Sequence, residues 1–247
     1  MLSFAVIAEG ATDQAVLENI LCGYFNGEDS PVVNRVQPPR TAKGIDPAPG
    51  GWTLVFRSLR AGEHRKALQY NNYVIIHIDT DVCEEPGFDV SRRAEDGRPL
   101  RPDEIIEQVK LKLVAAMDPE FCALNAARIV FAITVDSIEC WLLPLLYDGE
   151  AAKKAKITGC LEAANRKLQR LNQLPLSKAD NKILASYESA SREYSKHNKL
   201  MKHRDENPSL DIFVTNLEAL ASCAPGEGGE GMEPDKVASD SSLTIDD

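Results

Sequence analysis

Residues 73–81 read Tyr-Val-Ile-Ile-His-Ile-Asp-Thr-Asp, and this stretch decides the fold. Its continuous apolar run predicts a strand buried on both faces, as in the centre of a parallel sheet. Residues 2–8 predict a second buried strand, and residues 128–135 predict a third. Because strands alternate with helices, we expect an α/β fold in three layers, with a mainly parallel sheet flanked by helices. The helices are predicted from apolar spacing over 12–25, with Thr12 as the N-cap, and over 102–117 and 137–147.

The segments between these elements are less regular. Residues 26–51 are rich in proline and glycine and predict a long surface loop, whereas residues 52–56 predict a further strand and 60–70 a short basic helix. Beyond Gly149 the pattern is helical, over 161–171, 178–194 and 210–220. We therefore divide the chain into an α/β domain, a basic helical C-terminal region and an acidic tail too polar to order itself, with bounds 1–148, 149–222 and 223–247.

Charge is distributed unevenly along the chain. The 247 residues are 43% hydrophobic, which excludes disorder throughout, and carry a formal net charge of -10. Taken as a total, that charge argues against binding to nucleic acid. By segment, however, residues 1–150 carry -9, residues 151–204 carry +9 and residues 224–247 carry -6. An acidic half is thus followed by a basic one that can face a phosphate backbone.

Cysteines and apolar runs bear on the compartment. The six cysteines lack the paired spacing of a zinc site, so we expect reduced core residues in a cytoplasmic protein. No signal peptide is recognisable and no apolar run is long enough for a bilayer, so no membrane association is expected. His77 and Trp141 lie in apolar surroundings and are predicted to be core residues.

Acidic residues follow two of the predicted strands. Glu9-Gly10 ends the first, and Asp79 and Asp81 end the central one. The carboxyl ends of parallel strands meet at one crevice, where three carboxylates would repel each other without a cation. Such oxygen ligands suit Mg²⁺ or Mn²⁺. Each motif alone also fits a turn, a strand end or a helix cap, but their occurrence together favours a metal site.

A third strand brings two more acids to this edge. Asp136 and Glu139 follow residues 128–135, so either can be a further metal ligand or a hydrogen-bond acceptor that orients the ligands. The alternative interpretation is that Asp136 or Ser137 caps the next helix.

The order of these motifs resembles a known family. Ala8-Glu9-Gly10-Ala11-Thr12-Asp13, followed by Ile76-His77-Ile78-Asp79-Thr80-Asp81, resembles the Toprim domain of topoisomerases, bacterial primases, maturation ribonucleases and overcoming-lysogenization-defect nucleases. The resemblance covers about residues 1–145 and implies a Toprim or Rossmann-like sheet. It further implies that Glu9 is a general acid/base, that Asp79 and Asp81 bind Mg²⁺, that Gly10 allows close backbone approach and that Asp13 is an additional ligand.

A narrower resemblance extends to about residue 220. Residues 137–143, Ser-Ile-Glu-Cys-Trp-Leu-Leu, and the segment 199–217 are similar to small bacterial Toprim-like proteins grouped as a domain of unknown function. Those proteins are often encoded beside ATPases in antiviral (phage) defence loci. The resemblance therefore implies a defence role and a partner ATPase.

The densest basic cluster is predicted to bind nucleic acid through Lys196, Lys199, Lys202 and Arg204. A solvated helical face or a dock for an acidic partner explains the same cluster. The chain has no P-loop motif, which excludes nucleotide hydrolysis of that type, and it has neither a nucleophile elbow nor a convincing Cys-His pair.

These observations support a Mg²⁺-dependent nuclease acting on DNA or RNA as the first hypothesis. The second is a non-catalytic Toprim-like subunit that works with a partner ATPase, and the third is a toxin-like ribonuclease held inactive by its partner. A homo-oligomer is compatible with each hypothesis.

Overall fold

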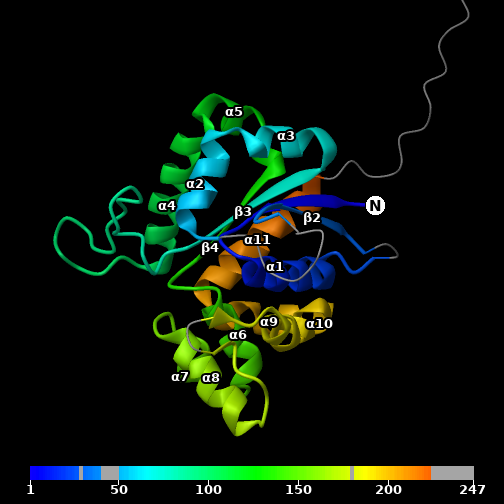
Figure 1. The fold of residues 1–247 in the computed structure, drawn as a ribbon, viewed down its shortest axis with the longest axis vertical. Coiled ribbons are helices and arrows are strands. Elements are labelled where there is room, and N and C mark those ends of the chain that lie inside the picture. Colours follow the sequence, from blue (N-terminus) through cyan, green and yellow to red (C-terminus); the bar gives the residue numbers. More distant parts are fainter. Residues whose placement is uncertain (28–29, 40–49, 179–180, 224–247) are drawn as a thin grey trace, which may run out of the picture.

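The α/β fold expected from the sequence is present in the computed structural model, which describes residues 1–27, 30–39, 50–178 and 181–223. Of the tail expected at 223–247, Cys223 ends the last described helix, and residues 224–247 lie outside the described residues. Within them, four parallel strands form the main sheet in the order β2-β1-β3-β4 (Figure 1). The strands are β1 (Ser3–Ile7), β2 (Val32–Gln37), β3 (Tyr73–Asp79) and β4 (Ile129–Thr134).

Helices cover both faces of the sheet, which explains why β3 is apolar throughout. Ile7 and Ile76 pack into the core on one face, whereas Val6 and Ile75 pack into the core on the other. Figure 1 shows one face covered by α2 (Trp52–Arg60), α3 (Glu63–Tyr70), α4 (Pro102–Met117) and α5 (Pro119–Leu124), and the other by α1 (Ala11–Tyr24) and α11 (Pro208–Cys223).

The region after β4 folds against the sheet's own core. Trp141, Tyr187 and Tyr194 are buried in the same apolar cluster as β1 and α1, and the Trp141 ring stacks on Phe213 with centroids 5.3 Å apart. The prediction that Trp141 is a core residue is confirmed. The elements here are η1 (Ala126–Arg128), α6 (Glu139–Leu146), α7 (Ala151–Lys154), α8 (Cys160–Arg170), β5 (Ser177–Lys178), β6 (Asn181–Lys182), α9 (Leu184–Ser191), η2 (Arg192–Ser195), α10 (His197–His203) and η3 (Arg204–Glu206).

Two predicted elements are wrong. Residues 52–56 belong to helix α2, whose Val55, Phe56 and Leu59 are buried at helical spacing. Their β-branched and aromatic character suggested a strand, but packing against the sheet decides the conformation. The missing strand is β2, inside the segment predicted as a loop. It is the edge of the sheet and partly exposed, and three of its six residues are polar, so it lacks the continuous apolar run of a buried strand.

Smaller corrections concern helix ends. The N-cap of helix α1 lies two residues earlier than expected, at Gly10 in place of Thr12. The predicted helix over 178–194 is shorter, because its first residues form the β5–β6 hairpin and α9 begins only at Leu184.

The expectation of six reduced cysteines is also wrong for one pair. Cys140 at the start of α6 and Cys160 at the start of α8 form a disulfide, whereas Cys22, Cys83 and Cys122 are free. A separation of 20 residues hides this proximity in the sequence, and it arises because α6 and α8 pack together. Within the described ranges, no helix has both the length and the apolar character to cross a bilayer.

The strand order reverses direction between β1 and β3. The chain passes from β1 to β2 on one side and then crosses to β3 on the other side of β1. In open parallel sheets such a switch point leaves a crevice at the carboxyl ends of the two strands, and ligands bind there. Glu9 and Asp79 lie at this position.

Candidate active site

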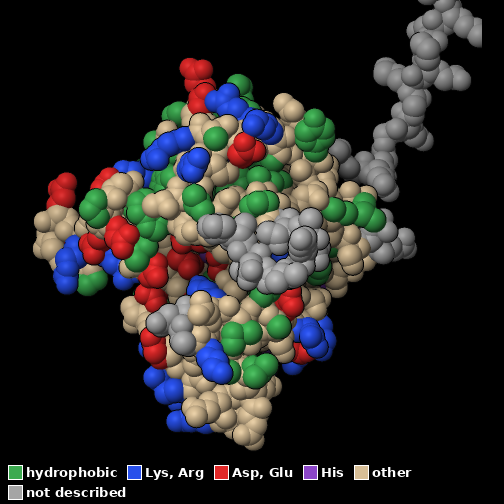
Figure 2. Space-filling model, in the orientation of Figure 1, with side chains coloured by type: hydrophobic (Ala, Val, Ile, Leu, Met, Phe, Trp, Pro, Cys, Tyr) green, Lys and Arg blue, Asp and Glu red, His purple; other side chains and the backbone are tan. Residues whose placement is uncertain are grey.

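Acidic side chains gather where β1, β3 and β4 end. Figure 2 shows red side chains in a hollow at the middle of the molecule, between the sheet and the α6–α8 region. A cleft of about 280 Å³ opens here. It is lined by Asp81, Asp136, Ser137, Glu139, Gly159, Cys160, Leu161, Glu162 and Lys182.

Glu9 and Asp79 contact each other directly. The backbone N–H of Asp79 donates to Glu9 Oε1 at 2.8 Å. The Asp79 side chain is buried and its Oδ1 accepts from the Thr134 hydroxyl on β4. The prediction that the ends of β1 and β3 bring these two acids together therefore matches the geometry.

The backbone before α2 also approaches Glu9 closely. Gly51 N–H donates to the Glu9 carbonyl at 2.8 Å, and a Cβ on Gly50 would lie 2.1 Å from that oxygen. A residue larger than glycine would thus displace the strand end that carries Glu9. Gly10, expected to allow such an approach, would place a Cβ 3.2 Å from Asp13 Oδ2, so its small size makes room for the chain's own carboxylate.

Asp13 and Glu139 complete the buried part of the cluster. Asp13 lies in the first turn of α1 and is 2% exposed, and Glu139 in the first turn of α6 is 1% exposed. Glu139 Oε1 accepts from Tyr187 and forms an ion pair with Lys182 Nζ at 2.9 Å. Glu139 is therefore held by a lysine and a tyrosine on the C-terminal side of the cleft.

Asp81 and Asp136 lie at the mouth of the cleft. Asp81 is exposed, and its backbone N–H donates to the Asp136 carbonyl at 3.0 Å. Asp136 adopts φ 70°, and its Oδ2 accepts from the Gly159 N–H at 3.1 Å, at the N-cap of α8. Neither Asp136 nor Ser137 caps α6, whose N-cap is Ile138 without a side-chain bond.

Burial and mutual repulsion change the proton affinity of these acids. Burial and the neighbouring Asp13 raise the pKa of Glu9 to about 8. Burial raises the pKa of Asp13 to about 6, with Glu139 adding to the effect and Lys182 opposing it. Burial, Asp13 and Glu9 hold the pKa of Asp79 well above its usual range. In the absence of a cation these carboxyl groups therefore bind protons more tightly than usual, which lowers the negative charge of the cluster.

Lys182 supplies most of the positive charge inside the cluster. Although burial opposes the change, Asp13, Glu139 and Asp79 raise the pKa of Lys182. The same lysine lowers the pKa of Glu139 against the effect of burial. No sequence signal identifies Lys182, because it lies on the two-residue strand β6 without a motif. Arg92 is a second residue that the sequence did not reveal, and its guanidinium lies 3.6 Å from Asp136.

His77 is buried beside the cluster, as expected of a sheet residue. Its Nε2 lies 3.5 Å from Asp79 Oδ1. Burial and the Lys182 charge lower the pKa of His77 to about 3, so the imidazole is neutral at physiological pH. It is unsuited to be a proton acceptor that titrates near neutrality.

The basic residues predicted to bind nucleic acid lie elsewhere. They are on or beside α10, whose His197 Nδ1 is 3.0 Å from the carbonyl of Gly23, at the end of α1. Asp13 lies in the first turn of α1, so the rise of 1.5 Å per residue places it about 15 Å from Gly23 along the helix axis. Three of the four predicted bases have acidic partners, since Lys196 pairs with Glu193, Lys202 with Asp148, and Arg204 with Asp211 and Glu218.

The side-chain atoms that lie close enough together to bind one metal ion are not those of Glu9, Asp79 and Asp81. Within the described residues, one trio of His, Cys, Asp or Glu side chains has all its ligating atoms within 4.8 Å, namely Asp136, Cys140 and Cys160. Glu9, Asp79 and Asp81 do not converge to that distance. The carboxylate cluster is therefore an open arrangement of acids around Lys182.

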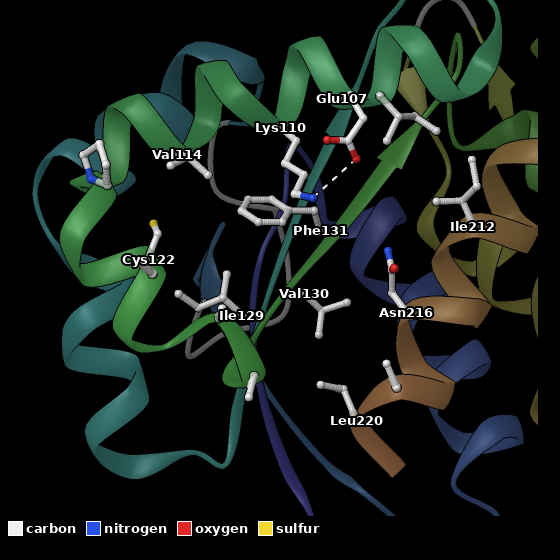
Figure 3. A pocket seen from close by; sticks show the side chains of 16 residues that line it. Glu107, Lys110, Val114, Cys122, Ile129, Val130, Phe131, Ile212, Asn216 and Leu220 are labelled. Carbon is white, nitrogen blue, oxygen red and sulfur yellow. Dashed lines mark hydrogen bonds and ion pairs between the residues drawn. The ribbon is translucent and has the colours of Figure 1, made fainter. Parts of the chain in front are cut away.

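A larger, apolar cavity of about 510 Å³ lies away from these acids (Figure 3). It is bounded by α4, β4 and α11, and its few polar side chains are Asn216 and the paired Glu107 and Lys110. It lacks the convergent charged groups that phosphate chemistry needs, so the carboxylate cleft is the better candidate.

Fold and site together define an α/β protein with an acidic crevice at the switch point of its sheet. Comparison with protein-family models, with curated proteins and with solved structures finds no match for this chain.

The raised pKa values predict how stability changes with pH. A group whose pKa is higher in the folded than in the unfolded state holds its proton more tightly when folded, so the free energy of unfolding falls as pH rises. For Glu9 this fall extends from about pH 4.5 to about 8. The lowered pKa values of His64 and His77 act in the opposite direction, but only below pH 6.5.

We therefore expect the melting temperature of the protein in EDTA to fall between pH 6.5 and pH 8. One proton corresponds to at most about 1.4 kcal/mol per pH unit. Glu9→Gln should flatten this slope, and Glu120→Gln, at an exposed position, should keep it. A slope that is the same in Glu9→Gln as in the wild type would contradict the assigned pKa.

Proposed function

We propose that this protein is a divalent-metal-dependent phosphodiesterase that cleaves DNA or RNA. The observation that carries the proposal is the group of carboxylates at the ends of three neighbouring strands, around a single lysine. A protein tolerates such buried repulsion poorly, and it is typical of sites that bind a cation or transfer protons.

The donor set fits Mg²⁺ or Mn²⁺. All of the clustered acids offer carboxylate oxygens, the ligands that these hard cations prefer. Burial and neighbouring acids raise the pKa values of Glu9, Asp13 and Asp79, so a bound cation would take the place of the protons that these groups hold. Asp79, Asp81 and Asp13 would hold the ion, and Glu139 would contribute if it left Lys182. A bound ion would stabilise the charge that develops on phosphoryl oxygens.

The chain's own residues supply the other functions of such a site. Glu9 has a pKa of about 8 and so keeps its proton at neutral pH, which suits a general acid that protonates a leaving oxygen. The Asp79 N–H fixes the position of the Glu9 carboxyl group. Lys182 lines the cleft and Arg92 pairs with Asp136 at its mouth, so both place positive charge where a phosphate backbone can be bound.

The family expectation is part of the same proposal. The Toprim resemblance assigns to Glu9, Asp79 and Asp81 the roles that their positions at the switch point suit. A role in phage defence, a cytoplasmic location and a partner ATPase remain predictions of that resemblance. Nucleic acid would be bound near Arg92 and Lys182, because the α10 bases are largely paired and lie at the other end of α1.

A second candidate is a non-catalytic subunit that retains the fold. The ion pair between Lys182 and Glu139 favours it, since an ammonium group already occupies the acidic cleft. Calorimetry separates the two candidates. A catalytic site should bind Mg²⁺ or Mn²⁺ in a manner that Asp79→Asn abolishes, whereas a scaffold should bind neither ion there.

The direct test is cleavage of labelled single- and double-stranded DNA and RNA by the purified protein. We expect cleavage with Mg²⁺ or Mn²⁺ and none in EDTA, with activity restored when the ion is added in excess. Binding of the ion without cleavage of any of the four substrates would favour the non-catalytic subunit.

A further inference from the structure

The disulfide lies on the wall of the candidate active site and beside a carboxylate. Cys160 and Asp136 both line the 280 Å³ cleft, and Cys140 follows Glu139 directly in the chain. Cys140 Sγ is 3.9 Å from Asp136 Oδ2. Cys140 and Cys160 are 0% and 1% exposed, so both are shielded from general solvent, and of the two Cys160 borders the cleft.

We propose that the reduced pair Cys140 and Cys160, with Asp136, forms a binding site for a thiophilic divalent cation such as Zn²⁺. Two thiolates and one carboxylate are three of the four ligands of a tetrahedral zinc site. The fourth position would face the cleft and be taken by water. This site is separate in ligand chemistry from the all-oxygen cluster of Glu9, Asp13 and Asp79, which suits Mg²⁺.

The distances between Cys140, Cys160 and Asp136 allow a metal ion to take the place of the S–S bond. Zn–S bonds of about 2.3 Å place two sulfurs of a tetrahedral site about 3.8 Å apart. The Cys140 and Cys160 Cα atoms are 5.0 Å apart, so rotation of the two side chains can open the sulfurs without separating α6 from α8. The present separation of Cys140 Sγ from the Asp136 oxygen is already close to a ligand-to-ligand distance.

The position of Asp136 is fixed independently of the cysteines. Its N–H donates to the Thr80 hydroxyl at 2.9 Å, and its carbonyl accepts from the N–H groups of Thr80 and Asp81. These bonds hold Asp136 at φ 70°, a conformation uncommon outside glycine. A carboxylate held in this way at the end of β4 is preorganised toward the two sulfurs.

The redox step balances with an external dithiol as the reductant. The dithiol gives two electrons and two protons, the Cys140–Cys160 bond breaks, two thiols form and the external dithiol becomes a disulfide. Zn²⁺ then binds the two sulfurs and their protons are released to water. An external disulfide oxidises the pair by exchange: it takes the two electrons and, with two protons from water, becomes a dithiol, while the Cys140–Cys160 bond forms again and the ion is released.

The test compares the oxidised protein with the protein reduced by a phosphine or dithiol, using Co²⁺ as a spectroscopic probe and Zn²⁺ as the competitor. We expect the reduced protein to bind one Co²⁺ with a thiolate-to-cobalt charge-transfer band that Zn²⁺ abolishes, and the oxidised protein to show no band. Cys140→Ser and Cys160→Ser should lose the band, and Asp136→Asn should weaken binding at least about tenfold. Cys22→Ser is the matched control and should behave as the wild type.

A second measurement needs no variant. In the reduced wild type, Zn²⁺ should protect Cys140 and Cys160, but not Cys22, from alkylation, as read by peptide mass spectrometry. A reduced protein without the charge-transfer band, or a band that persists in Cys140→Ser, overturns the proposal. So does equal alkylation of the pair with and without Zn²⁺.

Discussion

Asp79→Asn is expected to lower the rate of nucleic acid cleavage by about 10³-fold or more. Asp79 is the most enclosed acid at the end of the central strand, and it contacts Glu9 through its own N–H. Replacing it removes one negative ligand of the metal ion. Metal stabilisation of a phosphoryl group in the transition state is worth several kcal/mol, and each 1.36 kcal/mol of activation free energy changes the rate tenfold.

The substitution should leave the fold intact, which makes the result interpretable. An asparagine Oδ1 can still accept from the Thr134 hydroxyl, as Asp79 Oδ1 does. Removing a buried like charge should hold or raise the melting temperature in EDTA. Asp205→Asn, at an exposed position of η3, is the matched control and should cleave as the wild type. Undiminished cleavage by Asp79→Asn and by Glu9→Gln would disprove the assigned site.

The central part of the site could be predicted because it follows from sheet topology. Apolar runs mark β1 and β3, and an acid directly after each run must lie at the carboxyl edge of a parallel sheet. Glu9 and Asp79 therefore meet although they are 70 residues apart. The same argument predicted that Glu139 follows β4 at this edge of the sheet. It did not predict the ion pair between Glu139 and Lys182.

The rest depends on contacts that no local pattern encodes. Lys182 reaches the cluster because α9 and η2 pack on α1 and bring the β5–β6 hairpin over the sheet edge. The disulfide forms because α6 and α8 lie side by side. Net charge by segment pointed to the basic region as a whole, yet ion pairs neutralise Lys196, Lys202 and Arg204 individually. Such pairing is visible only in three dimensions.

Apolar spacing also misleads where one pattern suits two structures. Residues 52–56 are short, branched and aromatic, so they fit a strand as well as the first turns of an amphipathic helix. Burial of Val55, Phe56 and Leu59 against the sheet decides for the helix. β2 was missed for the opposite reason, since only one side of an edge strand is paired and its residues can be polar.

Lys182→Met is expected to destabilise the metal-free protein by about 2–3 kcal/mol. Methionine keeps the apolar stem but leaves Glu139, Asp13 and Asp79 without their shared cation. Breaking a fully buried ion pair costs about 3–5 kcal/mol, because one charge stays buried without a partner. The cost here is smaller, since 40% of the Lys182 side chain is exposed and Glu139 keeps its bond from Tyr187. Urea unfolding in EDTA measures the loss.

Lys178→Met is the matched control, because this lysine is exposed on the other strand of the same hairpin. It should change the free energy of unfolding by no more than about 0.5 kcal/mol. Equal effects of the two substitutions would show that Lys182 does not neutralise the cluster.

Divalent cations connect this result to the proposed function. Lys182 and a metal ion would neutralise the same carboxylates, and a ligand that binds only the folded state stabilises it in proportion to its affinity. Mg²⁺ or Mn²⁺ should therefore raise the free energy of unfolding of Lys182→Met more than that of the wild type. In the double variant Lys182→Met, Asp79→Asn this extra stabilisation by the ion should be absent. A Lys182→Met protein that is destabilised in EDTA and unchanged by either ion would mean that the acids hold the lysine and no metal. The non-catalytic subunit would then be the better description of the molecule.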